Sequence, residues 1–278
     1  MSLRHIKIRK NPKTFQRLFG INVTQFDEIL EKVEPKWQKR VILRYKRPGR
    51  AYKMHISDMI LMLLLYYRSY ITQMFVGHLF GVDDSRVCRI IQRLEPILAS
   101  VMAIQKCQKL SKEEMESLII DATEQPIDCP QRRQKPYYSG KKKRHTLKTE
   151  IRTTLKGRIV HVSKTQPGSA HDFKVFKLER PPPVETRVYV DAGYQGIADI
   201  HHNAEFPYKT SKNTPLDPEE KAYNAALSRL RVKVEHVFAQ LKTFKILSDR
   251  YRNKRKRYGV KFNIIAGLVN LKNGFSPA

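Results

Sequence analysis

Two short apolar runs that each lead into an aspartate constrain the fold of this chain most. Residues 118–120 precede Asp121, and residues 188–190 precede Asp191. Apolar runs of this length, bounded by polar residues and turn signals, are typical of buried strands. If these two strands are neighbours in one sheet, the two carboxylates come side by side at the end of the strands.

Strand and helix patterns alternate around these two runs. The pattern indicates strands at residues 117–120, 145–154, 158–165, 186–190 and near 206–208, with a hairpin turn at Lys156-Gly157. A short helix is expected at residues 171–179. A long helix begins at Asp217 or Pro218 and continues to about Phe244, with an apolar stripe along one face. The sequence therefore predicts an α/β layer fold for this part.

The chain before Leu110 has helical periodicity instead, so we expect a helical region, 1–110, followed by the strand-rich region, 111–278. One helix is expected through Val33 with Asn22 or Thr24 as its cap, and a buried helix at residues 55–67. Residues 72–79 and 85–98 are two more helices, separated by a turn at Gly81 and a cap at Asp83 or Asp84. The arrangement near 72–98 is helix, short turn, helix.

The second of these helices has two distinct faces. Its apolar face points to the core and comprises Val87, Ile90, Ile91 and Leu94. Arg86, Arg89 and Arg93 share another face, because they are three and seven residues apart. Such a face suits a DNA major groove or a row of phosphates. It is equally compatible with a charged, solvated helix surface.

Charge narrows the class of partner. The chain has 54 Lys and Arg against 26 Asp and Glu, which gives a formal net charge of +28. This excess indicates a polyanionic partner, and we expect nucleic acid rather than a membrane, because no secretory leader and no apolar run of about 18 residues is present. The three cysteines, Cys88, Cys107 and Cys129, suit neither a disulfide framework nor a paired zinc site, so we expect a reducing intracellular setting.

Three acidic residues are candidates for metal chemistry. Asp121 and Asp191 would repel each other at a sheet edge unless cations lie between them. Glu235, in the long helix and beside its apolar stripe, can supply a third carboxylate. Hard oxygen ligands of this kind prefer Mg²⁺, with Mn²⁺ as a substitute, and two such ions can drive in-line displacement at phosphorus.

Each acid also has a purely structural interpretation. Asp121 can cap a turn, Asp191 can begin the Ala192-Gly193 loop, and Glu235 can pair with Arg231 four residues earlier. Spacing alone leaves both interpretations open. The cationic segments that flank each acid favour the metal-binding one.

Four segments resemble the DDE transposases of bacterial insertion sequences, including the branch related to Harbinger elements. The matching segments are Ile120-Asp121-Ala122-Thr123 with Pro126-Ile127, Pro167-Gly168-Ser169-Ala170-His171-Asp172, Val190-Asp191-Ala192-Gly193-Tyr194-Gln195-Gly196, and Ser228-Arg229-Leu230-Arg231-Val232-Lys233-Val234-Glu235-His236-Val237-Phe238. The resemblance covers nearly the whole chain, and the four segments together are specific to the family.

The resemblance implies a ribonuclease-H-like catalytic domain of mixed sheet and helices, preceded by a helix-turn-helix region. It assigns the catalytic metal-binding positions to Asp121, Asp191 and Glu235. It also matches Arg231 and Lys242 to a helix signature with an Arg four residues before and a Lys seven residues after the Glu, and we expect both to position DNA. Many relatives have a Tyr where this chain has Ser228.

Other residues can assist. His171 and Asp172 are near the active centre in the family pattern, although Asp172 is also well suited to the start of a helix. The basic runs at 141–144 and 250–257 are expected to contact phosphates rather than act as an import signal. The tyrosines interleaved with these runs can stack on unpaired bases, but we expect half-buried packing from Tyr137, Tyr138, Tyr251 and Tyr258.

The sequence thus predicts a transposase that cleaves DNA at element ends and joins the 3′-hydroxyl to target DNA. Its expected partners are two divalent metal ions, the terminal inverted repeats and target DNA, and it is expected to be a homodimer or larger on DNA, in the cytoplasm and associated with the nucleoid. Two alternatives stay open. One is a transposase-derived protein that only binds DNA, and the other is an endonuclease without strand transfer.

Overall fold

The computed structural model describes residues 3–43, 52–104, 110–209 and 215–276. The chain forms two compact units. The first contains Met1–Ala103, Leu241–Asp249 and Arg255–Ala278, and the second contains Ile104–Gln240 and Arg250–Lys254. These units differ from the expected ranges 1–110 and 111–278 mainly at the C-terminus, because the last helix belongs to the first unit. Cys107 lies outside the described residues.

The first unit is helical. Its elements are α1 (His5–Ile8), α2 (Pro12–Phe19), α3 (Val23–Trp37), the π-helix η1 (Gln38–Leu43), α4 (Ile56–Ser69), α5 (Gln73–Phe80), α6 (Asp84–Met102), the 3-10 turns η5 (Lys245–Leu247) and η6 (Arg255–Arg257), and α10 (Tyr258–Lys272). Helix α4 is buried along nearly its whole length, which explains why its sequence is apolar on all sides. Helix α3 begins with the expected cap at Asn22, whose side chain and that of Gln25 form a reciprocal capping box.

Helices α5 and α6 form the predicted helix-turn-helix. Thr72 caps α5 and Asp83 caps α6, each through a side-chain oxygen that accepts a backbone N–H. At the turn Gly81 adopts a left-handed conformation with φ of 70°, and the N–H of Val82 donates to the carbonyl of Gly77 at 2.9 Å. This is a Schellman motif, which satisfies the last carbonyls of α5 and redirects the chain into α6.

Helix α10 packs on α6 around a buried carboxylate. The side chain of Glu95 is 2% exposed, accepts a hydrogen bond from the Tyr67 hydroxyl at 2.9 Å and pairs with the ammonium of Lys261 at 2.7 Å. The guanidinium of Arg257 lies 3.6 Å from its other oxygen. Burial lowers the pKa of Lys261, while the charge of Glu95 opposes that shift. A charged side chain is stable in a buried position only when it is paired and hydrogen-bonded. This cluster therefore fixes the position at which α10 packs on α6.

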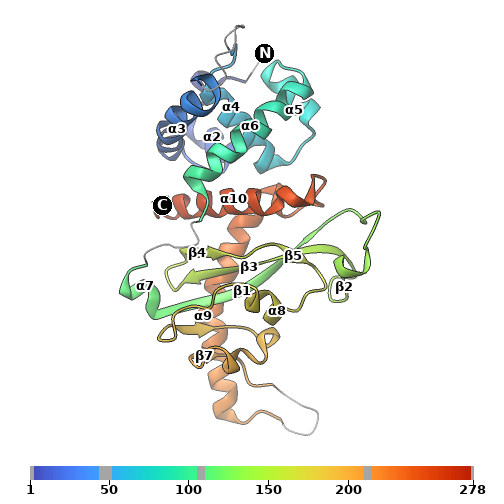
Figure 1. The fold of residues 1–278 in the computed structure, drawn as a ribbon. Helices are drawn as coiled ribbons and strands as arrows, with labels where there is room; N and C mark the ends of the chain where they lie inside the picture. The colour runs from blue at the N-terminus through green and yellow to red at the C-terminus, as the bar shows by residue number, and fades with distance from the viewer. Residues whose placement is uncertain (1–2, 44–51, 105–109, 210–214, 277–278) are drawn as a thin grey trace. The chain divides into compact units, whose positions relative to one another are not determined.

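The second unit is an α/β layer structure, as predicted. Its strands are β1 (Ser117–Pro126), β2 (Tyr138–Ser139), β3 (Arg144–Thr154), β4 (Ile159–Val162), β5 (Gln166–Pro167), β6 (Arg187–Tyr189) and β7 (Ala204–Glu205). Its helices are α7 (Lys112–Glu116), α8 (Asp172–Lys177), α9 (Pro218–Lys242) and the 3-10 turns η2 (Lys135–Tyr137), η3 (Ala192–Tyr194) and η4 (Ile197–Asp199). Figure 1 shows α8 and α9 on opposite faces of the sheet.

The sheet is mixed. Its order is β2-β3-β1-β6-β7, with β4 and β5 also paired to β3. Strands β1, β3 and β4 pair antiparallel, whereas β1, β6 and β7 pair parallel. One face of the sheet packs on α8 and the loop after β6 through Ile120, Phe176, Val188, Val190, Tyr194 and Ile197.

Several predicted strand boundaries were wrong. Strand β1 continues to Pro126, so Asp121 lies within a strand and not at its end. The reason is that β3 is long enough to pair with all of β1 from Leu118 onward, including its polar second half. The predicted strand 158–165 is divided into β4 and β5, the expected strand near 206–208 occurs at Ala204–Glu205, and the helix expected at 171–179 is shorter.

The turn between α5 and α6 provides a test of the packing. A Cβ atom at Gly77 would lie 2.4 Å from the carbonyl oxygen of Val82, whereas one at Gly140 would meet nothing within 4 Å. Gly77→Ala should therefore lower the unfolding free energy by about 1–3 kcal/mol, because backbone must shift to admit the methyl group. Gly140→Ala should stay within about 0.5 kcal/mol of wild type. Urea unfolding of both variants measures the difference, and equal stabilities would contradict the packing described.

Candidate active site

The parallel pairing of β1 and β6 brings Asp121 and Asp191 close together. Leu118 pairs with Val188 and Ile119 pairs with Tyr189. Asp121 lies two residues further along β1, and Asp191 lies two residues past the end of β6. The two carboxylates are near enough for the charge of Asp191 to raise the pKa of Asp121. This neighbourhood is the one that the sequence predicted.

Asp121 occupies a largely desolvated place. Its side chain is 18% exposed, and its Oδ2 lies 3.5 Å from Nη2 of Arg231 on α9, a side chain that is itself 21% exposed. Burial raises the pKa of Asp121 to about 6, with the nearby charges of Asp191 and Asp172 adding to the rise and Arg231 opposing it. A site that resists ionisation of one carboxylate is a site where added positive charge is favourable.

Asp191 caps the turn that follows β6. Its Oδ1 accepts a hydrogen bond from the N–H of Gly193 at 2.7 Å. A Cβ at Gly193 would lie 2.9 Å from this same oxygen and 2.9 Å from Oδ2 of Asp172. The carboxylates of Asp191 and Asp172 therefore converge on Gly193, and any larger residue there would crowd them.

Asp172 is held from the other side by a buried lysine. The ammonium of Lys148 on β3 donates to Oδ1 of Asp172 at 2.8 Å and lies 3.5 Å from Oε1 of Glu124 on β1. The Thr146 hydroxyl donates to the second oxygen of Glu124 at 2.8 Å. Lys148 is only 9% exposed, so its charge is tied to these two carboxylates. Asp172 is thus more than a helix N-terminal residue.

Glu150 lies buried beside this cluster. It pairs with Arg152 at 3.2 Å, and the Tyr194 hydroxyl donates to its other oxygen at 3.3 Å. Burial raises the pKa of Glu150 to about 7, although Arg152 and the Tyr194 hydroxyl act in the opposite direction. Burial, followed by the charge of Glu150, also raises the pKa of Tyr194 well above its usual value.

Glu235 lies apart from the two aspartates. It is exposed on α9, one helical turn after Arg231, and none of the ion pairs found among the described residues includes its carboxylate. Across the described ranges, no three His, Cys, Asp or Glu side chains lie close enough together to enclose a metal ion. The structure thus brings Asp121, Asp191 and Asp172 near one another but does not add Glu235 to them.

The predicted DNA-contacting residues lie in varied surroundings. Arg86 and Arg89 are exposed on α6, each 3.9 Å from Asp83, while the guanidinium of Arg93 hydrogen-bonds the hydroxyl of Tyr52. Arg231 contacts Asp121, as described above. Lys242 is the last residue of α9 and is exposed, and His171 is the residue before α8 and is exposed.

Both basic runs, 141–144 and 250–257, consist mostly of exposed residues. Residues 141–144 are exposed, and the last of them, Arg144, begins β3 and pairs with Ser139. Among the interleaved tyrosines, Tyr251 and Tyr258 are fully buried, Tyr137 is half-buried and Tyr138 is 45% exposed. The predicted half-buried packing therefore describes only Tyr137, and the two buried tyrosines have no surface on which a base can stack.

Lys148, Glu124, Glu150 and Tyr194 were not identified from the sequence. Tyr194 belongs to a matched segment, yet nothing in that segment indicates its hydrogen bond to Glu150. The signal that was available is the alternation Thr146, Lys148, Glu150, Arg152, which puts four polar side chains on one face of a strand and is unusual for a buried sheet.

Comparison with known proteins identifies the class. Residues 120–270 match the family described as DDE superfamily endonuclease, and residues 52–104 match the helix-turn-helix of DDE superfamily endonuclease. The chain therefore belongs to the DDE superfamily endonucleases, with the fold of a ribonuclease-H-like DDE domain preceded by a helix-turn-helix.

Two relatives are similar in sequence to this chain over most of its length. The chain is 38% identical over 270 residues to a protein of Microchaete diplosiphon named as a transposase for insertion sequence element IS702, covering 93% of this chain and 94% of the relative. It is 29% identical over 209 residues to a protein of Streptomyces albus G named as a transposase for insertion sequence element IS112, covering 73% and 75%. The predicted relationship to DDE transposases of insertion sequences is confirmed.

None of the helices in the described ranges combines the length and the apolar composition that a membrane span requires.

Burial of Glu150 predicts a dependence of stability on pH. Its pKa is about 7 in the folded protein, above the usual value of 4.5, so the folded state binds more protons between these values and stability falls as pH rises through that window. Relative to Glu150→Gln, wild type should lose about 1–3 kcal/mol of unfolding free energy between pH 5 and pH 8. Urea unfolding at both pH values measures this change, and a constant difference between the proteins would contradict it.

Proposed function

We propose that this protein is a DNA transposase that hydrolyses phosphodiester bonds at element ends and then transfers the 3′-hydroxyl into target DNA. The observation that carries this proposal is the proximity of Asp121, within β1, to Asp191, just past the end of the parallel neighbour β6. The family membership and the transposase names of two relatives support it.

The donor chemistry of the site fits divalent metal ions. Carboxylate oxygens of Asp121, Asp172 and Asp191 lie near one another, with the Arg231 guanidinium beside Asp121. Hard oxygen donors of this kind select Mg²⁺ or Mn²⁺ over softer metals. We infer that Asp121, Asp191 and Glu235 hold these ions. When bound, two such ions activate an attacking water or 3′-hydroxyl and stabilise the leaving oxygen.

Arg231 provides the link between Glu235 and the aspartates. Residues four apart on a helix have Cβ atoms roughly 5–6 Å apart. Since Arg231 contacts Asp121, Glu235 lies one helical turn from a residue that is already at the site. The Nε of Arg231 is buried and has no hydrogen-bond partner among the described residues, so this side chain is incompletely satisfied where it lies. We infer that Arg231 balances the charge of Asp121 and positions DNA together with Lys242.

We also infer that the helix-turn-helix contacts the DNA of the element ends through Arg86, Arg89 and Arg93.

Alanine substitution tests the three acids. Asp121→Ala, Asp191→Ala and Glu235→Ala should each lower Mg²⁺-dependent nicking of supercoiled plasmid by at least about 10³-fold, because each removes a ligand of the metal ions. Affinity for duplex DNA should change less than about threefold. Asp199→Ala, an exposed acid of η4, is the matched control and should nick as wild type does. Full nicking by the Asp191 variant would refute the assignment.

Strand transfer is tested separately from cleavage. Duplexes with a labelled 3′ end, taken from the DNA that flanks the gene, are incubated with protein, Mg²⁺ and a target plasmid. A transposase joins the label covalently to the plasmid, whereas an endonuclease without strand transfer cuts and releases it. A protein that only binds DNA does neither, although it still shifts the labelled duplex in a gel.

Asp172 is proposed as a positioning residue for Asp191. Asp172→Asn keeps the size of the side chain but weakens its pairing with Lys148, and the freed ammonium should then turn toward other carboxylates. We expect nicking to fall by about 10–100-fold and the Mg²⁺ concentration needed for half-maximal rate to rise. A variant that loses activity at saturating Mg²⁺ with no change in that concentration would contradict positioning through the metal-binding carboxylates.

A further inference from the structure

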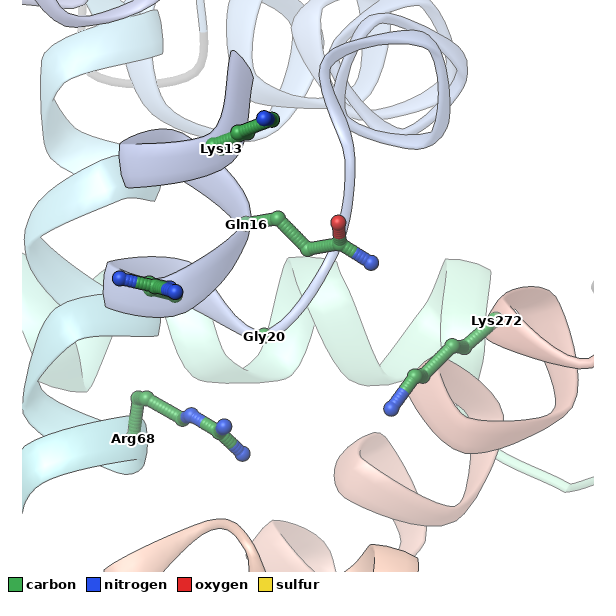
Figure 2. A pocket seen from close by; sticks show the side chains of 6 residues that line it. Lys13, Gln16, Gly20, Arg68 and Lys272 are labelled. Carbon is green, nitrogen blue, oxygen red and sulfur yellow. The ribbon is translucent and has the colours of Figure 1, made fainter. Parts of the chain in front are cut away.

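A pocket in the first compact unit has an unusual lining. Its volume is about 270 Å³, and it is lined by Lys13, Gln16 and Arg17 of α2, Gly20 after that helix, Arg68 of α4 and Lys272 of α10. Figure 2 shows Gln16, Arg68 and Lys272 extending into it from three different elements. Segments that are far apart in the sequence thus contribute to one cationic cavity.

The pocket contains four positive charges and no acid. Among the described residues, none of these four side chains has a hydrogen bond or an ion pair with a carboxylate, whereas Arg9, not far along the chain, pairs with Asp27 at 3.0 Å. Like charges held together without a counterion repel one another, and an anion in their midst removes that cost. The lining therefore favours an anionic ligand.

Arg68 and Gly20 both lie against the ring of Phe244 on one side of the pocket. The guanidinium of Arg68 lies 5.4 Å from the centre of the Phe244 ring, and burial lowers its pKa. Gly20 has a φ of +81°, and a Cβ there would lie 2.8 Å from Cζ of Phe244. Arg68 is therefore held over an aromatic ring at a point where the main chain has no side chain to block access. A guanidinium with a preset orientation matches the oxygens of a phosphate well.

We infer that this pocket binds a backbone phosphate of DNA, at a site separate from the α5–α6 helix-turn-helix. Arg68 lies within the matched residues 52–104 but on α4, before α5, whereas Lys13, Arg17 and Lys272 lie outside them. These three side chains are exposed, so they can reach phosphates next to the one bound at Arg68. The chain has 54 basic and 26 acidic residues, and this excess of positive charge favours a long polyanion as the ligand. The inference rests on the proposed function, because it takes DNA as the partner.

The test measures how strongly the full-length protein binds a labelled 40-base-pair duplex between 50 and 200 mM KCl. The pocket variant is Arg17→Gln with Lys272→Gln, and both residues are exposed, so folding should be unaffected. The control variant is Lys32→Gln with Lys39→Gln, two exposed lysines of α3 and η1 that carry the same charge change. Arg68→Gln is a second pocket variant, and circular dichroism and Tm verify that each protein is folded.

We expect both pocket variants to bind DNA roughly tenfold more weakly at low salt, as loss of a charged hydrogen bond implies. The slope of log K against log salt should decrease in magnitude by about 1 per lost phosphate contact. The control variant should keep the wild-type slope. Equal affinity and slope for pocket and control variants would overturn the inference and leave the proposed function intact. Absence of any DNA binding by wild type would instead overturn the proposed function.

A small phosphate compound is the other source of the same chemistry. Binding of inorganic pyrophosphate is therefore measured by calorimetry with the same proteins. If the pocket variants lose pyrophosphate binding while their DNA affinity equals that of wild type, the ligand is a free phosphate compound and the DNA assignment is wrong. If pyrophosphate competes with DNA for wild type but not for the pocket variants, the inference is supported.

Discussion

The desolvated pairing of Asp121 with Arg231 is the interaction on which the candidate site depends. A carboxylate in the middle of a strand, covered by a helix, is costly unless positive charge lies beside it. Arg231 provides that charge from α9 at 3.5 Å, and burial nevertheless raises the pKa of Asp121 to about 6. The pairing therefore links α9 to the middle of β1.

The topology of the sheet creates this situation. The parallel β1–β6 pair requires a crossover connection, and that connection contains β3, β4 and α8, which carry Lys148 and Asp172 to the region of Asp191. The chain then returns along the other face as α9, with Arg231 and Glu235 one turn apart. Asp121, Asp172, Asp191 and Arg231, which are remote in sequence, thus lie near one another because each belongs to an element of the sheet, or to a helix or turn next to it.

Much of the fold and part of the candidate site were predictable from the sequence, because they depend on local residue patterns. The strands that precede Asp121 and Asp191, the long helix with Glu235 and the helix-turn-helix with its caps follow from apolar period and turn residues. The far end of β1 was missed, because its residues are polar and only pairing with β3 makes them a strand. The packing of α10 in the first unit was also missed. That helix is buried on nearly every side, so its sequence has no separate apolar and polar faces that would indicate where it packs.

The charge balance of the site explains why Asp172 and Lys148 matter although neither was decisive in the sequence. Four carboxylates, Asp121, Glu124, Asp172 and Asp191, gather with two cations, Lys148 and Arg231. The group thus has more acidic than basic side chains, and the two cations are already paired with Asp121, Glu124 and Asp172. This imbalance between acidic and basic side chains is the feature of the site that supports the proposed binding of divalent ions.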